Sequence, residues 1–329
     1  MDNQVLNHHQ NSTWKIISCL VSLISVCFTQ FTFSLLPLFL PASSSLTLLP
    51  LSALLLVIVV GFGRLCKNIA GVRASAPAFV FFTIFFVWAL YISVVRQVIT
   101  SLMDIVFNLE IIMVMIGLCR IMSVDPGFVT HHSSCQELLH SPLGEVKAHG
   151  EELKISTCAV QQESATEEVF TLHRRIKYCR HCNNYVMGFD HHCPAFGNCI
   201  GQRNHVLFVV LLLGFVISEA SFVACASQFT ADFETLNDVD RKGTVSKNLV
   251  LGTMLFCLIQ VLWQVIFLMW HVYCACFNIK TDEWINWRKY PEFQINIIPA
   301  GQAQTAIQFI NPYDKGILRN LKEFLTAKG

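Results

Sequence analysis

Charged residues are scarce in this chain of 329 residues. Asp, Glu, Lys and Arg together make up 14% of it, against roughly 25% in an ordinary soluble domain. Hydrophobic residues make up 53%, and the mean hydropathy is +0.52. A water-soluble globule cannot bury so much apolar surface, and a disordered chain would be far more polar. The composition therefore excludes both classes and predicts a protein that crosses a membrane several times.

An excess of charge of either sign is also missing. The 23 basic and 22 acidic residues leave a formal net charge of +1, which provides no overall field to attract nucleic acid. We therefore expect no nucleic-acid partner. We also expect no cleavable signal peptide, because the first apolar stretch is much longer than the roughly 7–15 residues of a signal core.

Uncharged runs predict six membrane-spanning helices. Residues 16–63 contain no Asp, Glu, Lys or Arg, which is enough for two spans of about 20 residues each. Pro37 and Pro41 provide the turn between them. The expected fold is an all-α polytopic membrane protein with a small cytosolic loop domain. The expected spans cover residues 16–40, 45–63, 74–95, 103–121, 205–228 and 248–277.

The segment between the fourth and fifth spans has a different composition. It contains eight of the twelve histidines and a higher density of charged residues than the expected spans, which indicates a soluble loop domain. The expected domains are 1–121 (tail and four spans), 122–204 (loop domain), 205–277 (two spans) and 278–329 (C-terminal tail). Lys and Arg near the span ends place both termini and the loop domain in the cytosol, by the positive-inside rule.

Cysteine and histidine gather in one part of this loop domain. Cys179 and Cys182 form a C-x2-C pair, and His192 and Cys199 follow. Three thiolates and one imidazole make a closed tetrahedral shell, which is typical of structural zinc. The alternative is a set of unligated thiols, but a small cytosolic domain with little core of its own favours a metal.

Other reactive groups lie beside these ligands. Asp190, His191 and Cys193 supply an orienting carboxylate, a base and a thiol nucleophile, and a nearby imidazole lowers the pKa of a thiol. The spacing alone leaves a second assignment open. In that assignment Cys193 is the fourth metal ligand and Cys199 is a packing thiol.

This segment resembles the DHHC cysteine-rich domain of membrane protein S-acyltransferases (palmitoyltransferases). Residues 125–127 (Asp-Pro-Gly) are similar to the family's DPG motif. Residues 280–283 (Lys-Thr-Asp-Glu) resemble its TTxE motif with the first Thr replaced, and residues 311–325 resemble its C-terminal aromatic and Asn motif. Asn204 fits the family position that closes the domain. These pieces occur in family order from about residue 122 to residue 325.

The resemblance implies that Cys193 accepts the acyl group, with His191 as its base and Asp190 orienting His191. It implies a transfer of a fatty acyl (palmitoyl) group from acyl-CoA to cysteine thiols of proteins, through a thioester on Cys193. The implied partners are acyl-CoA, proteins with membrane-proximal cysteines, and the lipid bilayer of the endomembrane system or plasma membrane. The implied zinc ligands are Cys179, Cys182, His192 and Cys199.

The sequence departs from the family at a second zinc site. Tyr178 and Tyr185 stand where that site needs His and Cys, so we expect one zinc ion, with hydrogen bonding or aromatic packing in place of the other. The usual Trp after the DHHC-Pro sequence is Ala195. These losses favour an alternative function, a catalytically weak membrane adaptor that keeps the zinc domain to bind proteins. Candidates for an improvised second site are Cys135, Cys158, His173 and His181.

Two further groups of polar residues are candidates for structural or binding roles. Glu110 and Glu219 lie within expected spans, where a charge needs a partner. We expect hydrogen bonds within the bundle, with Gln260 and Gln264 pairing helices, rather than a channel or transporter pathway. The basic residues near the cysteines are candidates for binding CoA phosphates, the alternative being a solvated or lipid-facing set. They are Arg174, Arg175, Lys177 and Arg180.

Overall fold

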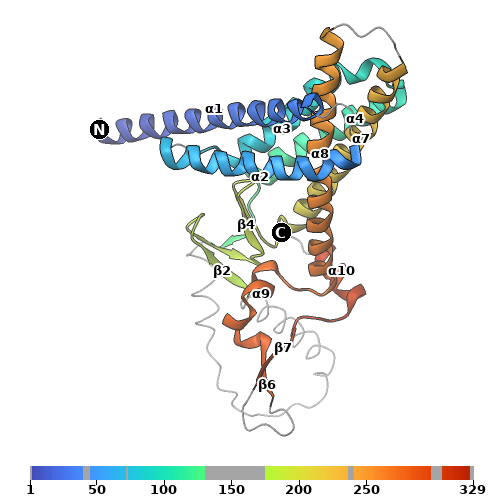
Figure 1. Cartoon of the computed structure of the whole chain (residues 1–329). Helices are drawn as coiled ribbons and strands as arrows, with labels where there is room; N and C mark the ends of the chain where they lie inside the picture. The colour runs from blue at the N-terminus through green and yellow to red at the C-terminus, as the bar shows by residue number, and fades with distance from the viewer. Residues whose placement is uncertain are drawn as a thin grey trace, which may run out of the picture. The chain divides into compact units, whose positions relative to one another are not determined.

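The computed structural model describes residues 2–39, 45–71, 73–129, 175–235, 241–297 and 306–326. Within this part of the chain, six helices contain a stretch long and apolar enough to cross a membrane, which confirms the expected number of spans (Figure 1). These helices are α1 (Asp2–Phe39), α2 (Ser45–Ala70), α3 (Ala76–Ser93), α4 (Ser101–Ser123), α7 (His205–Thr235) and α8 (Arg241–Cys276).

The chain divides into two compact units. The helical unit contains Met1–Met122, Pro194–Gly197 and Val209–Trp270, and the cysteine-rich unit contains Ser123–Cys193, Asn198–Phe208 and His271–Gly329. The segment expected as a loop domain and the segment expected as a C-terminal tail therefore belong to the same compact unit. Contacts within that unit organise the candidate site.

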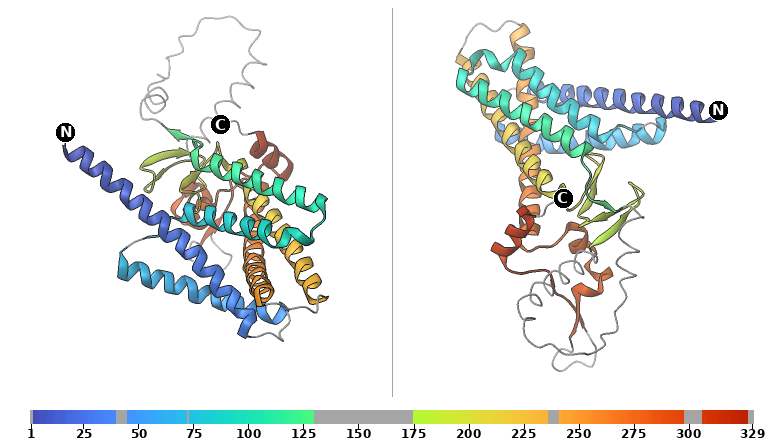
Figure 2. Two further views of the ribbon diagram at one scale, coloured as in Figure 1. Left: turned by 90° about the horizontal axis from the view of Figure 1, so that it is seen from above. Right: turned by 180° about the vertical axis from the view of Figure 1, so that it is seen from behind.

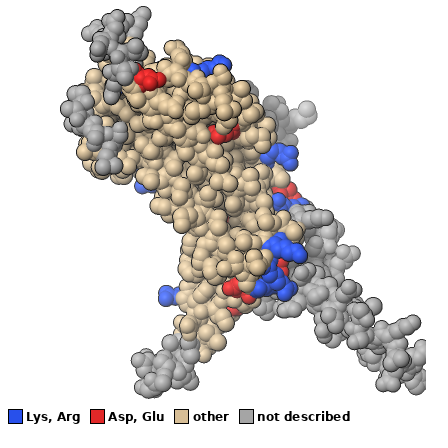
Figure 3. Space-filling model, turned by 90° about the vertical axis from the view of Figure 1, so that its right-hand side faces the viewer, with Lys and Arg blue, Asp and Glu red and all other residues tan. Residues whose placement is uncertain are grey.

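The helical unit has a core of large side chains. Phe33, Tyr91, Phe107 and Phe222 are fully buried, and α1 packs against α2 and α3 (Figure 2). A Cβ atom at Gly252 would lie 2.7 Å from the backbone of Phe33, so glycine permits the close approach of α8 to α1. Many outward side chains are large and apolar, and the surface over these helices in Figure 3 is almost free of charge. Such a surface suits lipid.

One polar contact joins two helices inside the helical unit. Gln264 on α8 donates a hydrogen bond from Nε2 to Oε1 of Glu219 on α7, at 3.0 Å. This contact agrees with the expectation that Glu219 is hydrogen-bonded within the bundle and that Gln264 pairs helices. One buried carboxylate oxygen of Glu110 has no hydrogen-bond partner among the described residues.

Short antiparallel strands build the cysteine-rich unit. The strands β1 (Phe128–Val129), β3 (Asn184–Met187) and β2 (Ile176–Cys179) form one sheet in that order, and β4 (His191–Cys193) pairs with β5 (Asn198–Ile200). In the hairpin, His192 lies opposite Cys199 and Cys193 lies opposite Asn198. The C-terminal elements are α9 (Thr281–Asn286), β6 (Gln294–Ile297), β7 (Ala306–Phe309) and α10 (Ile317–Thr326).

Candidate active site and metal centre

Strand β4 directs consecutive side chains to opposite faces. Successive residues of a strand alternate between its two sides, so His192 points away from His191 and Cys193. The neighbours of each side chain agree with this separation. The Nδ1 atom of His192 lies 3.4 Å from the Sγ atom of Cys182, whereas Nδ1 of His191 lies 2.7 Å from Oδ2 of Asp190. The sequence Asp-His-His-Cys therefore serves two different clusters.

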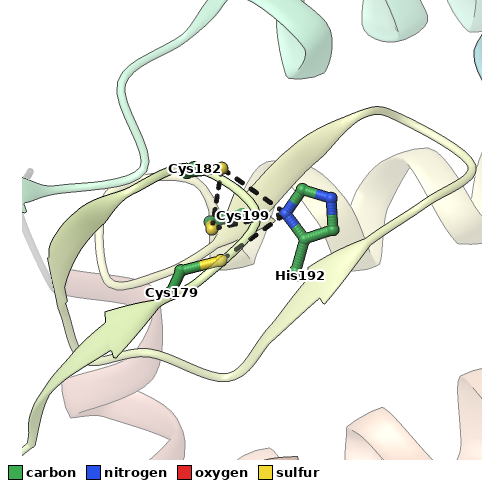
Figure 4. A group of neighbouring side chains, drawn as sticks. All are labelled: Cys179, Cys182, His192 and Cys199. Atoms are coloured by element: carbon green, nitrogen blue, oxygen red, sulfur yellow. Dashed lines mark hydrogen bonds between the residues drawn. The ribbon is translucent and has the colours of Figure 1, made fainter.

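The first cluster contains Cys179, Cys182, His192 and Cys199 (Figure 4). The Nδ1 atom of His192 lies 3.8 Å from Sγ of Cys179 and 3.6 Å from Sγ of Cys199. The Sγ atoms of Cys182 and Cys199 are 3.4 Å apart. A zinc ion with bonds of about 2.3 Å to sulfur and about 2.0 Å to nitrogen sets its ligands roughly 3.4–3.8 Å apart. The four side chains thus fit one tetrahedral metal ion.

The structure also bears on the choice between Cys193 and Cys199. Cys199 joins the other three candidate ligands, whereas Cys193 lies outside that cluster. Cys199 comes to this position because β5 pairs it with His192. The geometry therefore favours the assignment in which the thiol of Cys193 is left for chemistry.

The second cluster is centred on Asp190, which is fully buried. Its neighbour His191 has a pKa raised to about 9: burial acts to lower it, but hydrogen bonds to Asp190 and to Cys193 outweigh burial. Because Nδ1 of His191 faces Asp190, Nε2 is the ring nitrogen left for Cys193. A carboxylate, an imidazole and a thiol are thus connected in the order that an activated nucleophile needs.

Backbone groups fix the position of Asp190. Its Oδ1 atom accepts a hydrogen bond from the N–H of Thr281 at 2.9 Å. Its carbonyl oxygen accepts one from the N–H of Asp282, and its own N–H donates to Ile200. Burial alone would raise the pKa of Asp190, but His205, His191 and Lys280 hold it well below its usual range. Asp190 therefore stays an anion in a buried position.

Two further histidines lie around this carboxylate and were missed by the sequence reasoning. The Nε2 atom of His205 is 3.8 Å from Oδ1 of Asp190, and Nδ1 of His271 is 4.0 Å from Oδ2. Their only sequence signal is a polar imidazole at the end of an otherwise apolar helix. Nothing in the local spacing indicates that they meet Asp190.

The comparisons with known proteins agree with this site. The model of the family described as DHHC palmitoyltransferase matches residues 166–288. The chain carries a DHHC palmitoyltransferase domain. The resemblance found in the sequence is thereby confirmed, and the matched residues include every side chain of the two clusters described above.

Curated relatives show the same similarity. The chain is 26% identical to Palmitoyltransferase ZDHHC17 of Mus musculus over 61% of its own length and 30% of that protein. It is 28% identical to Probable protein S-acyltransferase 1 of Arabidopsis thaliana over 63% of its own length and 59% of that protein. The chain therefore spans only part of each of these relatives.

Side chains of the segments around residues 125 and 204 stabilise turns in the cysteine-rich unit. Asp125 accepts hydrogen bonds at Oδ1 from the N–H groups of Gly127 and Phe128, and its Oδ2 pairs with Arg203 at 2.6 Å. Gly127 has a φ of +107°, which favours glycine. Asn204 donates to the carbonyl of Cys199 and accepts from the N–H of Gly201, both at 2.8 Å.

The C-terminal motif is attached to the end of α8. Asn311 donates to the carbonyl of Phe277 at 2.6 Å, and Asn320 donates to that of Cys276 at 2.9 Å. These carbonyl groups lie where the helix ends and lack a helical partner. The motif therefore satisfies the end of the last span and holds the C-terminal segment in the cysteine-rich unit.

Two of the basic candidates for binding CoA phosphate contact protein groups. Arg175 pairs with Glu283 at 2.9 Å and lies 3.8 Å over the ring of Tyr313. Lys177 pairs with Asp282 at 3.4 Å. The side chains of Arg175 and Lys177 are 11% and 13% exposed, and binding of CoA phosphates by these residues stays a prediction. Arg180 is exposed, and Arg174 lies outside the described residues.

The two tyrosines that depart from the DHHC motif form an aromatic pair. Tyr178 and Tyr185 are opposite each other in the β2–β3 pair, with ring centroids 5.1 Å apart. His181 stacks on the metal candidate His192 at 4.7 Å. The other candidates for an improvised site, Cys135, Cys158 and His173, lie outside the described residues.

Proposed function

We propose that the protein is an S-acyltransferase that moves a fatty acyl (palmitoyl) group from acyl-CoA to cysteine thiols of proteins. The observation that carries this proposal is the connected set of Asp190, His191 and Cys193. A thiol next to an imidazole that is held by a buried carboxylate is suited to form and break thioesters. The names of the relatives support the same class of reaction.

The reaction has two steps. His191 takes the proton from Sγ of Cys193, and the thiolate attacks the thioester carbonyl of acyl-CoA. The bond to the CoA sulfur then breaks, and this sulfur receives the proton from His191. In the second step His191 takes a proton from the substrate thiol, which attacks the acylated Cys193. The Cys193 sulfur leaves as a thiolate and regains its proton from His191.

We further propose that the four-residue cluster binds one zinc ion. A shell of four protein ligands has no open position for a substrate, so this zinc is structural. Through His192 and Cys199 it would hold the two strands of the β4–β5 hairpin together. Such a connection keeps His191 and Cys193 in place on the other side of β4.

The position of Cys193 in the chain suits a lipid substrate. Pro194–Gly197, which directly follow Cys193, belong to the helical unit, where the ring of Phe196 stacks on that of Phe215. The thiol thus lies where the chain passes from one unit to the other. A fatty chain gains about 0.8 kcal/mol for each CH₂ group that it buries, so the tail of acyl-CoA would insert into lipid while its CoA head group stays in water.

The remaining parts of the proposal concern the cell. The positive-inside distribution of Lys and Arg supports a cytosolic position for the DHHC domain, where its thiols would stay reduced. The substrates would be proteins with cysteines near the membrane. The location would be the endomembrane system or the plasma membrane.

Labelling with a fatty acyl-CoA probe tests the function. Purified protein is expected to take up label through a bond that hydroxylamine cleaves, and Cys193→Ser should abolish this label. Label that persists in Cys193→Ser would place the nucleophile elsewhere.

A catalytically weak membrane adaptor is the second candidate. Ala195 and the Tyr178–Tyr185 pair favour it, because they replace residues that the family usually carries. An unlabelled wild-type protein that still contains zinc would support the adaptor over the enzyme.

A further inference from the structure

A basic side chain lies behind the carboxylate that holds His191. The Nζ atom of Lys280 is 3.2 Å from Nδ1 of His205, and Nε2 of the same ring is 3.8 Å from Oδ1 of Asp190. His205 therefore lies between a cation and the buried anion. Lys280 begins the segment 280–283, which resembles the TTxE motif with its first Thr replaced.

The contact with Lys280 determines which nitrogen of His205 carries the proton. A lysine ammonium group has three donors and no acceptor, so Nδ1 of His205 must accept from it. The ring proton is then on Nε2, the nitrogen that faces Asp190. The other tautomer would place an N–H group against the ammonium and a lone pair against the carboxylate. Both contacts of that tautomer would be repulsive.

The two oxygens of Asp190 consequently have different surroundings. Oδ2 faces Nδ1 of His191 at 2.7 Å. Oδ1 accepts the Thr281 N–H at 2.9 Å and faces the Nε2 side of His205. This arrangement restricts rotation of the carboxylate, and a fixed carboxylate keeps His191 in the tautomer that leaves Nε2 for Cys193.

The ion pairs nearby explain why Lys280 is the cation that compensates the negative charge of Asp190. The neighbouring carboxylates already have cations of their own: Glu283 pairs with Arg175 and Asp282 pairs with Lys177. A buried anion without a compensating charge is costly. Lys280, acting through His205, supplies this compensation.

We propose that Lys280 and His205 are positioning residues for the nucleophile, acting in series through Asp190 and His191. The proposal rests on the function proposed above and adds two residues to its machinery. Neither residue needs to touch acyl-CoA. Their removal should therefore slow the chemistry without weakening the binding of acyl-CoA.

The experiment compares Lys280→Met, Lys280→Arg, His205→Phe and the double variant Lys280→Met/His205→Phe in full-length protein. The control is Lys289→Met, which removes a lysine whose Nζ contacts Asn286 instead. Self-acylation gives kcat and the KM for palmitoyl-CoA. The rate at which iodoacetamide alkylates Cys193, followed by mass spectrometry of its peptide, needs no enzymatic activity. Zinc content and thermal unfolding report on the fold.

We expect kcat to fall about 10- to 100-fold in Lys280→Met and in His205→Phe, a range like that for residues that orient a metal-ligating histidine, with KM unchanged. Lys280→Arg should recover most of the activity because it keeps the cation. The double variant should be no slower than the slower single variant, because the two residues act in one series. Alkylation of Cys193 should slow in the same order, with zinc retained and Lys289→Met like wild type.

Several results would overturn the proposal. A raised KM at unchanged kcat would mean that Lys280 binds CoA, and additive losses would mean that the two residues act separately. If wild type takes up no acyl group, the proposed function fails, and the alkylation rates alone decide the present question. Alkylation that is equally fast in wild type, Lys280→Met and His205→Phe would refute the series.

Discussion

Arg175 and Glu283 are 108 residues apart in the chain and form an ion pair in which the side chains are 11% and 2% exposed. This pair joins the segment before the C-x2-C sequence to the motif after the last span. The same motif provides the backbone N–H group of Thr281, which donates a hydrogen bond to Oδ1 of Asp190. A contact that stabilises the cysteine-rich unit therefore also supports the candidate site.

Breaking this pair on one side should destabilise the cysteine-rich unit strongly. Arg175→Met leaves the buried Glu283 carboxylate without its partner, and we expect a loss of about 3–5 kcal/mol in the free energy of unfolding. Denaturant unfolding followed by zinc release would measure it. Arg175→Met/Glu283→Met should lose less. The exposed Lys315–Glu323 pair is the control, since Lys315→Met should cost about 0–1 kcal/mol.

Removing the charge of Asp190 should stop catalysis but leave the metal bound. Asp190→Asn keeps the size of the side chain, yet it no longer supports a positive His191 or fixes its tautomer. We expect single-turnover acylation to slow by on the order of 10³- to 10⁴-fold, as for the acid of a Ser-His-Asp triad. Metal analysis should still find zinc. Glu323→Gln on α10 serves as control, and an active Asp190→Asn would contradict the assigned role.

The metal should be essential for the fold of the cysteine-rich unit. We expect about one zinc ion per chain by elemental analysis, and none after Cys179→Ala or Cys199→Ala, because three ligands hold zinc poorly. Loss of the ion should expose the β4–β5 hairpin to proteolysis. Cys276→Ala, which changes a thiol outside the cluster, should keep its zinc. A content of two zinc ions per chain would show that ligands beyond the four named here bind metal.

The close approach of α8 to α1 gives a prediction for the helical unit. Gly252→Ala introduces a Cβ atom 2.7 Å from the backbone of Phe33, so one helix must move. We expect a loss of about 1–3 kcal/mol, the usual cost of overpacking. Gly61→Ala is the matched control, because a Cβ atom there meets nothing within 4 Å. Thermal unfolding in detergent or nanodiscs would compare the two variants.

Features that depend on residues close together in the sequence could be predicted from it. The six spans follow from uncharged runs, and the four residues that gather into the metal cluster follow from the spacing of Cys and His within a short segment. The strand alternation of β4 also depends only on sequence order. It separates His192 from His191 as the proposed roles require.

Features that depend on distant contacts could not be predicted. The sequence suggests that Lys177 is free to bind a phosphate. In the structure it forms an ion pair with Asp282 and lies over the ring of Tyr290. His205 and His271 reach Asp190 from the ends of two apolar helices. No periodicity or spacing encodes these encounters, because each joins residues from separate elements of the folded chain.

The pairing of β4 with β5 determines which sulfur lies outside the candidate metal cluster. A shift of this register by one residue would turn every side chain of β4 to the opposite face. Cys193 would then face the thiol pocket, and His192 would be next to Asp190. A zinc ion held between His192 and Cys199 would prevent this shift. The metal would thus fix the strand register. Its loss would inactivate the protein by turning Cys193 toward the other thiols, even if the chain stayed compact.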